Sequence, residues 1–305
     1  MEPSETLGRE ASASVSERGL QEFIVNIAGI SIFFLFDKSP LEFGIRNIES
    51  EFITDKPPQI KLQMHNDGFP EKKQDKKIFD SGSTWSLYRN QGMYLLQDDS
   101  LDPGSSVEKL VILESDFKSG DIYIKNDLFN QNLIPDPLGY PLNQVLMILL
   151  LSHLGGLLFH ACGIEDRGLG YLFLGNSTHG KSTMARLWSE NQATVLNDDR
   201  VIVRKKDGEL WMYGTPWHGD FAEVSPKGIP INRIFFLRHG KRNKAVPKED
   251  REAVSMLLTR CFPPLWDKKG MDDSVGLCHL IANKLPCYEL SFIPNSQIIN
   301  FVRNI

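Results

Sequence analysis

The stretch GNSTHGKST, residues 175–183, has the residue types and the spacing of a loop that binds phosphate. It fits the pattern G-x-x-x-x-G-K-[ST], in which Gly175 and Gly180 let the main chain pass close to phosphate oxygens. In such loops the lysine contacts the β- and γ-phosphates, and the hydroxyl after it binds Mg²⁺. We therefore expect Lys181 to hold the phosphates of a nucleoside triphosphate such as ATP, and Ser182 to ligate Mg²⁺. The residues expected to bind the nucleotide are Gly175, Asn176, Ser177, Thr178, His179, Gly180, Lys181, Ser182 and Thr183.

The sequence on either side of this loop is what a phosphate-binding loop requires: residues 171–174 form a short apolar run typical of a strand. Met184, Leu187 and Trp188 then follow the i, i+3, i+4 spacing of a helix that faces a core. This order of strand, loop and helix directs the free N–H groups of the new helix at a phosphate. Thr178 stands where many such loops carry glycine, so the turn there must be made differently or with strain. The alternative interpretation is a glycine-rich turn with an incidental lysine.

Two adjacent carboxylates, Asp198 and Asp199, follow the apolar run TVL in the segment LNDDR. A phosphoryl-transfer site needs one acid to meet the metal ion and another to take the proton of the attacking hydroxyl. Neighbouring acids at the end of a strand can point into one pocket and do both, and the alternative is a solvated turn. His160 lies in the apolar run LLFHACG, where a lone histidine is usually a core residue with satisfied hydrogen bonds. These residues by themselves therefore assign no catalytic role to His160.

The elements that must position these residues divide the chain into two halves. From residue 23 to about 125, short strand patterns alternate with clusters of Asp, Gly, Pro and Ser, which predicts a β-rich half. A polar insert at about 66–80 is expected to be a solvated loop, and the turn-rich segment 126–141 is expected to link the halves. The run 142–154 then predicts a buried helix that ends at Gly155.

After this helix, strand and helix patterns alternate in the manner of an α/β or mixed sheet covered by helices. We therefore expect a disordered polar tail over 1–20, a β-rich domain over 21–135 and a nucleotide-binding catalytic α/β domain over 136–305. The β-rich domain is suited either to recruiting a substrate or to building a homo-oligomer.

The composition excludes several classes of protein. The 305 residues include 34 basic and 39 acidic ones, a formal net charge of -5, without a sustained basic stretch to bind nucleic acid or an anionic membrane. The longest apolar run, residues 145–151, is too short to span a bilayer, and the first residues lack the apolar core of a secretory signal. Four cysteines without metal-ligand spacing are expected to be free thiols in a reducing compartment. The sequence therefore predicts a cytoplasmic protein.

The segments FHACGI, GNSTHGKST and LNDDRVIV, in this order and spacing, resemble the bacterial HPr kinase/phosphorylase family. The catalytic domain of that family is similar to phosphoenolpyruvate carboxykinases, so the resemblance implies a P-loop kinase domain of this type over 136–305. It implies that Asp198 is the general base on an acceptor serine hydroxyl, and that Asp199 lies with it around the metal and the phosphate. It also places His160 in the catalytic set. Glu223, in DFAEVSPKGIPI, stands near the position of a metal-associated glutamate.

The resemblance covers roughly residues 145–300, with its detail from His160 to about Ile231. An RGLG-type segment of the family is replaced by SPKGIP in this chain. The stretches GTPWHGDF and LPCYELSFIPN look like those of divergent HPr-kinase-like proteins, a group that includes kinases of lasso-peptide precursors. Further candidates are Arg238 and Arg260 for a late basic residue that holds phosphate, and Trp217 and His218 for the acceptor pocket.

Together the residues and the resemblance predict a kinase that transfers the γ-phosphoryl group of ATP, with Mg²⁺, to a serine of a protein or peptide. A small-molecule kinase of the same fold would use the same loop and acids. A regulatory module that binds ATP without chemistry is the other class, although binding alone would not need a proton acceptor beside the phosphate. The predicted metal ligands are Ser182, Asp199 and Glu223.

Overall fold

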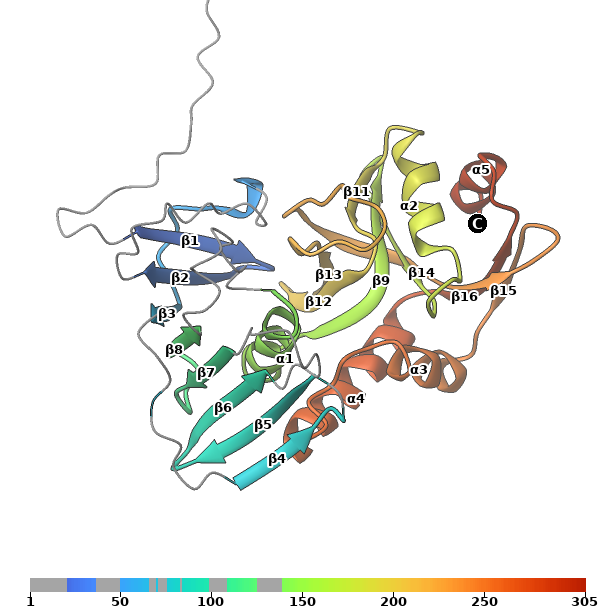
Figure 1. The fold of residues 1–305 in the computed structure, drawn as a ribbon. Helices are drawn as coiled ribbons and strands as arrows, with labels where there is room; N and C mark the ends of the chain where they lie inside the picture. The colour runs from blue at the N-terminus through green and yellow to red at the C-terminus, as the bar shows by residue number, and fades with distance from the viewer. Residues whose placement is uncertain are drawn as a thin grey trace, which may run out of the picture.

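The structure is a computed structural model that describes residues 21–36, 50–65, 70, 76–82, 84–98, 109–124 and 139–305. Within these ranges the chain has a mixed α/β fold with two multi-strand sheets and few helices, the first sheet on the left and the second on the right of Figure 1. The tail expected over 1–20 and almost all of the linker expected over 126–141 lie outside the described residues. The expected domain boundary at 135 also lies outside them and stays a prediction.

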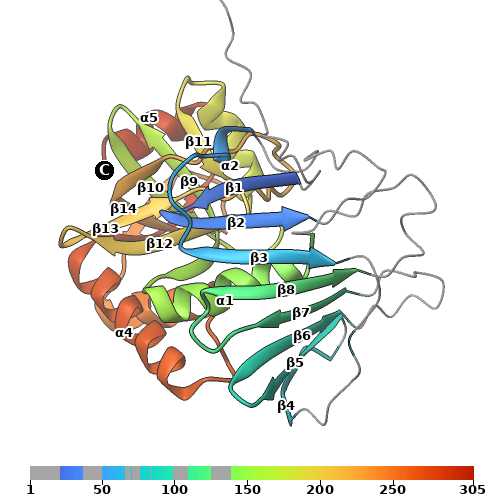
Figure 2. The same cartoon turned by 90° about the vertical axis from the view of Figure 1, so that its left-hand side faces the viewer.

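The first half of the chain folds into one eight-stranded sheet, as its short apolar runs predict. The strand order is β1-β2-β3-β8-β7-β6-β5-β4, with β3 parallel to both of its neighbours and the other pairs antiparallel (Figure 2). Buried and more open positions alternate along β3 and β7, so one face of the sheet packs on a core. The elements are β1 (Gln21–Ile27), β2 (Ile30–Phe36), a 3-10 turn (Ser50–Phe52), β3 (Ile60–His65), β4 (Lys76–Asp80), β5 (Trp85–Asn90), β6 (Met93–Asp98), β7 (Lys109–Leu113) and β8 (Ser119–Ile124).

The polar insert at about 66–80, expected to be a solvated loop, is in part a strand. Its last residues, KKIFD, form β4 at the edge of the first sheet, where they pair with β5. Ile78 and Phe79 explain the difference, because both are partly buried against the core of this sheet. Phe79 also stacks on Trp85, with 4.9 Å between the ring centroids. The rest of the insert, apart from Pro70, lies outside the described residues.

Helix α1 (Leu142–Leu154) joins the two halves of the chain. Eight of its 13 residues are buried, around most of its circumference, as the apolar sequence LNQVLMILLLSHL predicts. All of these side chains except Ile148 share one core cluster with the first sheet and with Leu158 and Ile202 of the second, so α1 lies between the sheets (Figure 1). The helix ends at Gly155, whose φ of 79° is in the region that favours glycine. No helix in the described ranges is long and apolar enough to cross a membrane.

Arg204, on the second sheet, holds the end of α1 and the first sheet together. Its Nη1 donates to the carbonyl of Ala28 (2.7 Å), in the turn between β1 and β2. Its Nε and Nη2 donate to the carbonyls of Gly155 (2.9 Å) and Leu154 (3.0 Å) at the end of α1. A guanidinium satisfies these carbonyls well, since the last carbonyls of a helix have no partner within the helix.

We expect Arg204→Ala to lower the free energy of unfolding by about 2 kcal/mol, because hydrogen bonds to a charged donor are the stronger ones and these are partly screened by solvent. Urea denaturation would measure the change. The matched control is Lys205→Ala, at the exposed neighbouring position, which should change the stability by less than about 0.5 kcal/mol. Equal effects of the two substitutions would show that the three carbonyl contacts contribute little.

Two long strands, β9 and β14, organise the second sheet. β9 pairs with β12 as far as His160, and with β10 and β11 beyond it. β14 pairs with β13 over its first residues and then with β10 and β16. Both strands carry unbroken buried runs, typical of strands that are covered on both faces. The strands are β9 (Leu157–Asp166), β10 (Leu169–Leu174), β11 (Thr194–Asn197), β12 (Arg200–Lys206), β13 (Glu209–Tyr213), β14 (Gly228–His239), β15 (Lys244–Pro247) and β16 (Cys287–Phe292).

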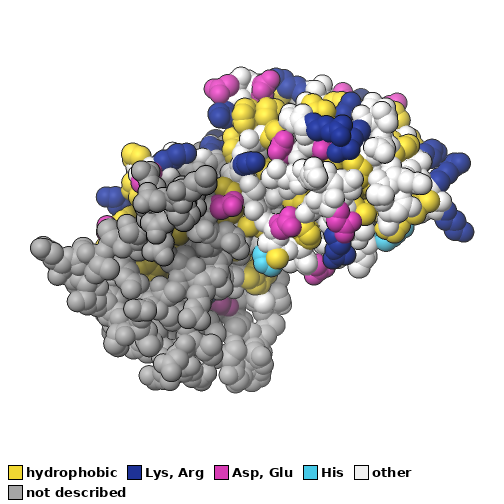
Figure 3. Space-filling view, turned by 90° about the horizontal axis from the view of Figure 1, so that it is seen from above, with side chains coloured by type: hydrophobic (Ala, Val, Ile, Leu, Met, Phe, Trp, Pro, Cys, Tyr) yellow, Lys and Arg dark blue, Asp and Glu magenta, His cyan; other side chains and the backbone are white. Residues whose placement is uncertain are grey.

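Helices cover both faces of this sheet. α2 (Lys181–Ser189) and α5 (Gln297–Arg303) share a core cluster with one face, and α3 (Asp250–Leu258) and α4 (Lys268–Lys284) share a cluster with the other. Over the described part of the face seen from above, Lys and Arg side chains lie interspersed with Asp and Glu side chains (Figure 3). The four cysteines are free, as expected, with Cys162, Cys278 and Cys287 buried and Cys261 half-buried.

Candidate active site

The glycine loop, His160 and the aspartates lie in or next to three neighbouring strands. The register of these strands places them side by side across the sheet. β10 ends at Leu174, which pairs with Ala161 of β9, so the loop leaves the sheet beside His160. On the other edge of β9, Arg200 pairs with His160, and the N–H of Ala161 donates to the carbonyl of Asp199 (3.2 Å). The three sequence motifs therefore form one row across β10, β9 and β12, called here the catalytic row.

The loop 175–180 has the shape that its two glycines predict. A Cβ added at Gly175 would lie 2.9 Å from the Cβ of His179, and one added at Gly180 would lie 2.8 Å from the ring of Phe292. Gly180 has a φ of 94° and immediately precedes α2, which begins at Lys181. Within the loop, the N–H of Asn176 donates to Nδ1 of His179 (3.3 Å). The loop is thus tight at both ends, and the N-terminus of α2 follows it directly, as an anion-binding loop requires.

Thr178 occupies the left-handed region of the backbone, with a φ of 71°. A β-branched residue rarely adopts this conformation, which costs on the order of 1–3 kcal/mol when the surrounding structure imposes it. The strain expected from the missing glycine is therefore present. The sequence shows this in advance, because only the residue type at this position departs from the glycine found in many such loops.

We expect Thr178→Gly to raise the free energy of unfolding by about 1 kcal/mol, because glycine adopts this φ without strain. The gain is no larger because glycine also makes the unfolded chain more flexible. Urea denaturation would measure it. The control is Ser177→Gly, at the neighbouring exposed position without a positive φ, which should lower the stability by about 0.5 kcal/mol. If both substitutions destabilised the protein alike, Thr178 would carry no strain.

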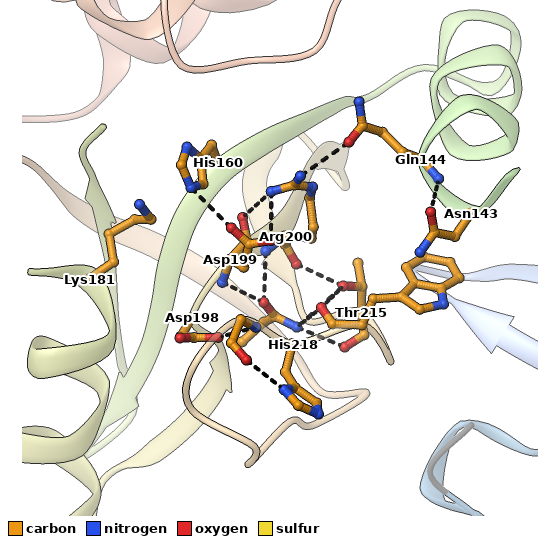
Figure 4. A network of polar contacts seen from close by, with 12 residues as sticks. Asn143, Gln144, His160, Lys181, Asp198, Asp199, Arg200, Thr215 and His218 are labelled. Atoms are coloured by element: carbon orange, nitrogen blue, oxygen red, sulfur yellow. Dashed lines mark hydrogen bonds and ion pairs between the residues drawn. The ribbon is translucent and has the colours of Figure 1, made fainter. Parts of the chain in front are cut away.

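Lys181 lies at the start of α2 and is buried, with 6% of its surface exposed. Its Nζ donates to the carbonyls of Gly175 (3.1 Å) and Asn176 (3.3 Å), so the ammonium lies within the loop. Burial lowers the pKa of this amine, and the nearby charges of Asp199 and Asp198 oppose that effect. Figure 4 shows Lys181 facing these aspartates and His160. A cation is therefore held where the loop and the carboxylates meet.

Asp199 is held by two basic side chains. Its Oδ1 lies 3.0 Å from Nε2 of His160, and its Oδ2 accepts a hydrogen bond from Nη1 of Arg200 (2.7 Å). Burial alone would raise the pKa of Asp199, but the His160 hydrogen bond and the charge of Arg200 outweigh it and bring the pKa below its ordinary value. Arg200 also donates to Oε1 of Gln144 on α1 (3.1 Å, Figure 4). Its guanidinium lies over the ring of Phe262. The Asp199 carboxylate is thus ionised and fixed toward His160.

Asp198 differs from its neighbour, because it is 1% exposed and bound to the main chain. Its Oδ1 accepts the N–H of Gly219 (2.7 Å), and its Oδ2 accepts the N–H of Phe221 (3.1 Å). Both amides belong to the segment between β13 and β14 that contains GTPWHGDF. The two aspartates are adjacent in sequence and near Lys181, but they hold different parts of the site.

Asn197 is a site residue that the sequence argument missed. Its side chain is fully buried; Oδ1 accepts the N–H groups of Asp199 and Arg200, both at 2.7 Å. Its Nδ2 donates to the carbonyls of Thr215 (2.9 Å) and Trp217 (2.8 Å). Asn197 thereby makes the bend between β11 and β12 that presents the aspartates. The available signal was an asparagine directly before an acidic pair, since Asn side chains commonly satisfy the amides that follow them in such bends.

Of the predicted metal ligands Ser182, Asp199 and Glu223, Glu223 has a partner outside the glycine loop and the aspartate pair. Ser182 lies at the start of α2, directly after the glycine loop, and Asp199 lies in the bend before β12. The Glu223 carboxylate accepts a hydrogen bond from Oγ of Ser189 (2.9 Å), near the other end of α2 and about 10 Å along its axis from Ser182. The described residues contain no cluster of three His, Cys, Asp or Glu side chains suited to a metal ion. The metal role of Glu223 stays a prediction.

The remaining candidates surround the loop and the aspartates. Arg238 forms an ion pair with Glu289 (2.7 Å), and Arg260 donates to the carbonyl of Met256 (2.8 Å), while its own carbonyl accepts the N–H of His160 (2.8 Å). The charge of Arg260 helps to lower the pKa of His179, after burial and His239, so Arg260 lies near the loop. Trp217 is half-buried against the core that α1 shares with the first sheet, and His218 is exposed. Their role in an acceptor pocket stays a prediction.

The residues present fit ATP and Mg²⁺. The loop amides, the N-terminus of α2 and Lys181 offer donors to phosphate oxygens, and the close contacts at Gly175 and Gly180 leave no room for larger residues there. Mg²⁺ in such sites needs one or two protein oxygens besides the phosphates and keeps several waters. The hydroxyl of Ser182 and a carboxylate of the aspartate pair supply that number without Glu223.

Comparison with known proteins found similarity to solved structures. No protein-family model and no curated protein matches the chain. Among solved structures, the HPr(Ser) kinase/phosphatase from Coxiella burnetii is similar, with 12% sequence identity and a TM-score of 0.31, over 48% of this chain and 94% of that one. The case for a function therefore depends on the residues of the catalytic row themselves.

Proposed function

We propose that this protein is an ATP- and Mg²⁺-dependent kinase that transfers the γ-phosphoryl group to a serine hydroxyl of a protein or peptide. The catalytic row carries this proposal, because it sets a phosphate-binding loop beside His160 and two aspartates, with Lys181 facing them. Phosphoryl transfer needs this combination, since the protein mainly positions the reactants and stabilises charge. The resemblance of the three motifs to HPr kinase/phosphorylase supports serine as the acceptor.

In this proposal, the loop amides and Lys181 hold the phosphates of ATP in place. The acceptor oxygen attacks the γ-phosphorus, the bond from that phosphorus to the β–γ bridging oxygen breaks, and ADP leaves with the electron pair. The hydroxyl proton passes to the carboxylate pair, whose member Asp199 is ionised at neutral pH because its pKa lies below the ordinary value. Ser182 and a carboxylate of the pair would hold Mg²⁺, which would supply positive charge to neutralise the phosphate oxygens.

The deciding experiment is transfer of labelled γ-phosphate from Mg²⁺-ATP to a panel of serine peptides and, in parallel, to small hydroxyl metabolites. Transfer to peptides is the expected result. Transfer to small hydroxyl compounds alone would instead identify a small-molecule kinase with the same site. ATP binding in calorimetry without transfer or hydrolysis would identify a regulatory module, and absence of ATP binding would exclude all three.

A further inference from the structure

The segment 214–221, which we call the acceptor loop, is built onto the catalytic row at both its base and its tip. At the base, a Cβ added at Gly214 would lie 2.2 Å from the carbonyl oxygens of Leu196 and Ser225, so the loop packs directly on β11. Asn197 holds the next residues through the carbonyls of Thr215 and Trp217, as described above. These contacts fix the position of the base of the acceptor loop.

At the tip, Asp198 is the anchor. The residues 218–220 are exposed, yet the N–H groups of Gly219 and Phe221 are held by the buried Asp198 carboxylate at 2.7 and 3.1 Å. A Cβ added at Gly219 would lie 3.0 Å from both Asp198 oxygens, so a side chain there would push the loop or the carboxylate away by a few tenths of an ångström. A carboxylate with both oxygens accepting main-chain amides is a strong fixed anchor.

The acceptor loop lies on the side of the row from which an acceptor must come. In phosphoryl transfer, the attacking and leaving oxygens lie in line on opposite sides of the phosphorus. The leaving group lies toward the glycine loop and Lys181, so the attacking hydroxyl approaches from the other side of the aspartates. In the view of Figure 4, His218 of the acceptor loop lies on the side of Asp198 away from Lys181.

We propose that Asp198 is a positioning residue, which holds the acceptor loop at the catalytic row so that this loop binds the hydroxyl-bearing polypeptide. This role rests on the proposed phosphotransfer and differs from the base role that the resemblance implies. The two aspartates then have different roles. Asp199 faces His160 and the reacting groups, and Asp198 holds the acceptor loop, which contacts the acceptor.

Hydrogen exchange followed by mass spectrometry tests the anchor without any need for activity. In Asp198→Asn, the amides of Gly219 and Phe221 should exchange at least about tenfold faster, because the charged acceptor is lost. Gly219→Ala keeps the carboxylate but pushes the loop away from it, and it should give the same increase. Asp199→Asn is the matched control, since Asp199 contacts neither amide, and it should leave their exchange as in the wild type.

The second measurement separates positioning from proton transfer, with the best serine peptide from the panel as the probe. Both Asp198→Asn and Gly219→Ala should raise KM for this peptide about tenfold, with a change in kcat of less than about threefold and unaltered affinity for Mg²⁺-ATP. If Asp198→Asn abolished kcat at unchanged peptide KM while Gly219→Ala did not, Asp198 would be the base and the proposal would be overturned. Unchanged exchange in both variants would overturn the anchor, whereas absence of transfer by the wild type would refute the kinase function instead.

Discussion

Replacing Lys181 by methionine should weaken the binding of Mg²⁺-ATP by about 100-fold and lower phosphoryl transfer by about 100- to 1,000-fold. The ammonium lies inside the glycine loop, bonded to the carbonyls of Gly175 and Asn176, and it faces the aspartates of the catalytic row. Phosphate oxygens compete well for such a donor, because an ionised acceptor forms the stronger hydrogen bond. The effect should be large in transfer, since charge develops on these oxygens as the bond to ADP breaks.

Methionine suits this test because it is close to lysine in length and carries no charge, so the buried volume stays filled. The free energy of unfolding should change by no more than about 1 kcal/mol. Calorimetry with Mg²⁺-ATP measures the affinity, and labelled transfer measures the rate. The control is Lys206→Met, on the exposed end of β12 over the ring of Trp211, which should leave both unchanged. Wild-type affinity in Lys181→Met would mean that the loop holds no nucleotide phosphate.

The local elements of the second half follow closely from the sequence, because each one is encoded by a short pattern. The apolar run before the glycine loop is β10, the helix after it is α2, and the helix expected over 142–154 is α1 with the same bounds. The strand expected to end at the aspartates is β11, and a separate strand, β12, begins after the bend that carries them. What the patterns do not encode is register, which decides that β10 ends beside His160 and that Arg200 pairs with it.

The parts of the site that were missed depend on contacts between distant segments. Glu223 has a metal role in the resemblance, but its placement follows from the hydrogen bond to Ser189, which no local pattern of the DFAEV stretch reveals. The separation of roles between Asp198 and Asp199 likewise depends on where the amides of the acceptor loop lie. Thr178 is the opposite case, because a residue type at one position of a known pattern was enough to predict strain.

The bend that carries the aspartates should be among the most sensitive points of the fold, and Asn197→Ala tests it. The substitution should lower the free energy of unfolding by about 3 kcal/mol. It leaves two buried N–H groups, of Asp199 and Arg200, and two carbonyls, of Thr215 and Trp217, without the side chain that now satisfies them. Alanine has no polar atom that could replace these hydrogen bonds. Leaving a buried polar group without a partner costs more stability than its hydrogen bond contributes when formed.

Urea denaturation measures this loss of unfolding free energy, and two further variants provide smaller losses for comparison. Thr215→Val removes the hydroxyl that donates to the carbonyl of Arg200 (2.9 Å) and accepts from Nδ2 of Asn197 (3.3 Å), and it should cost about 1 kcal/mol. Asn304→Ala removes an asparagine bond at an exposed helix end and should cost less than about 0.5 kcal/mol. Because Asn197 supports both aspartates and the acceptor loop, Asn197→Ala should also lose transfer at temperatures where it is still folded. A stable variant with full transfer would show that β9 and β12 alone hold the aspartates in place.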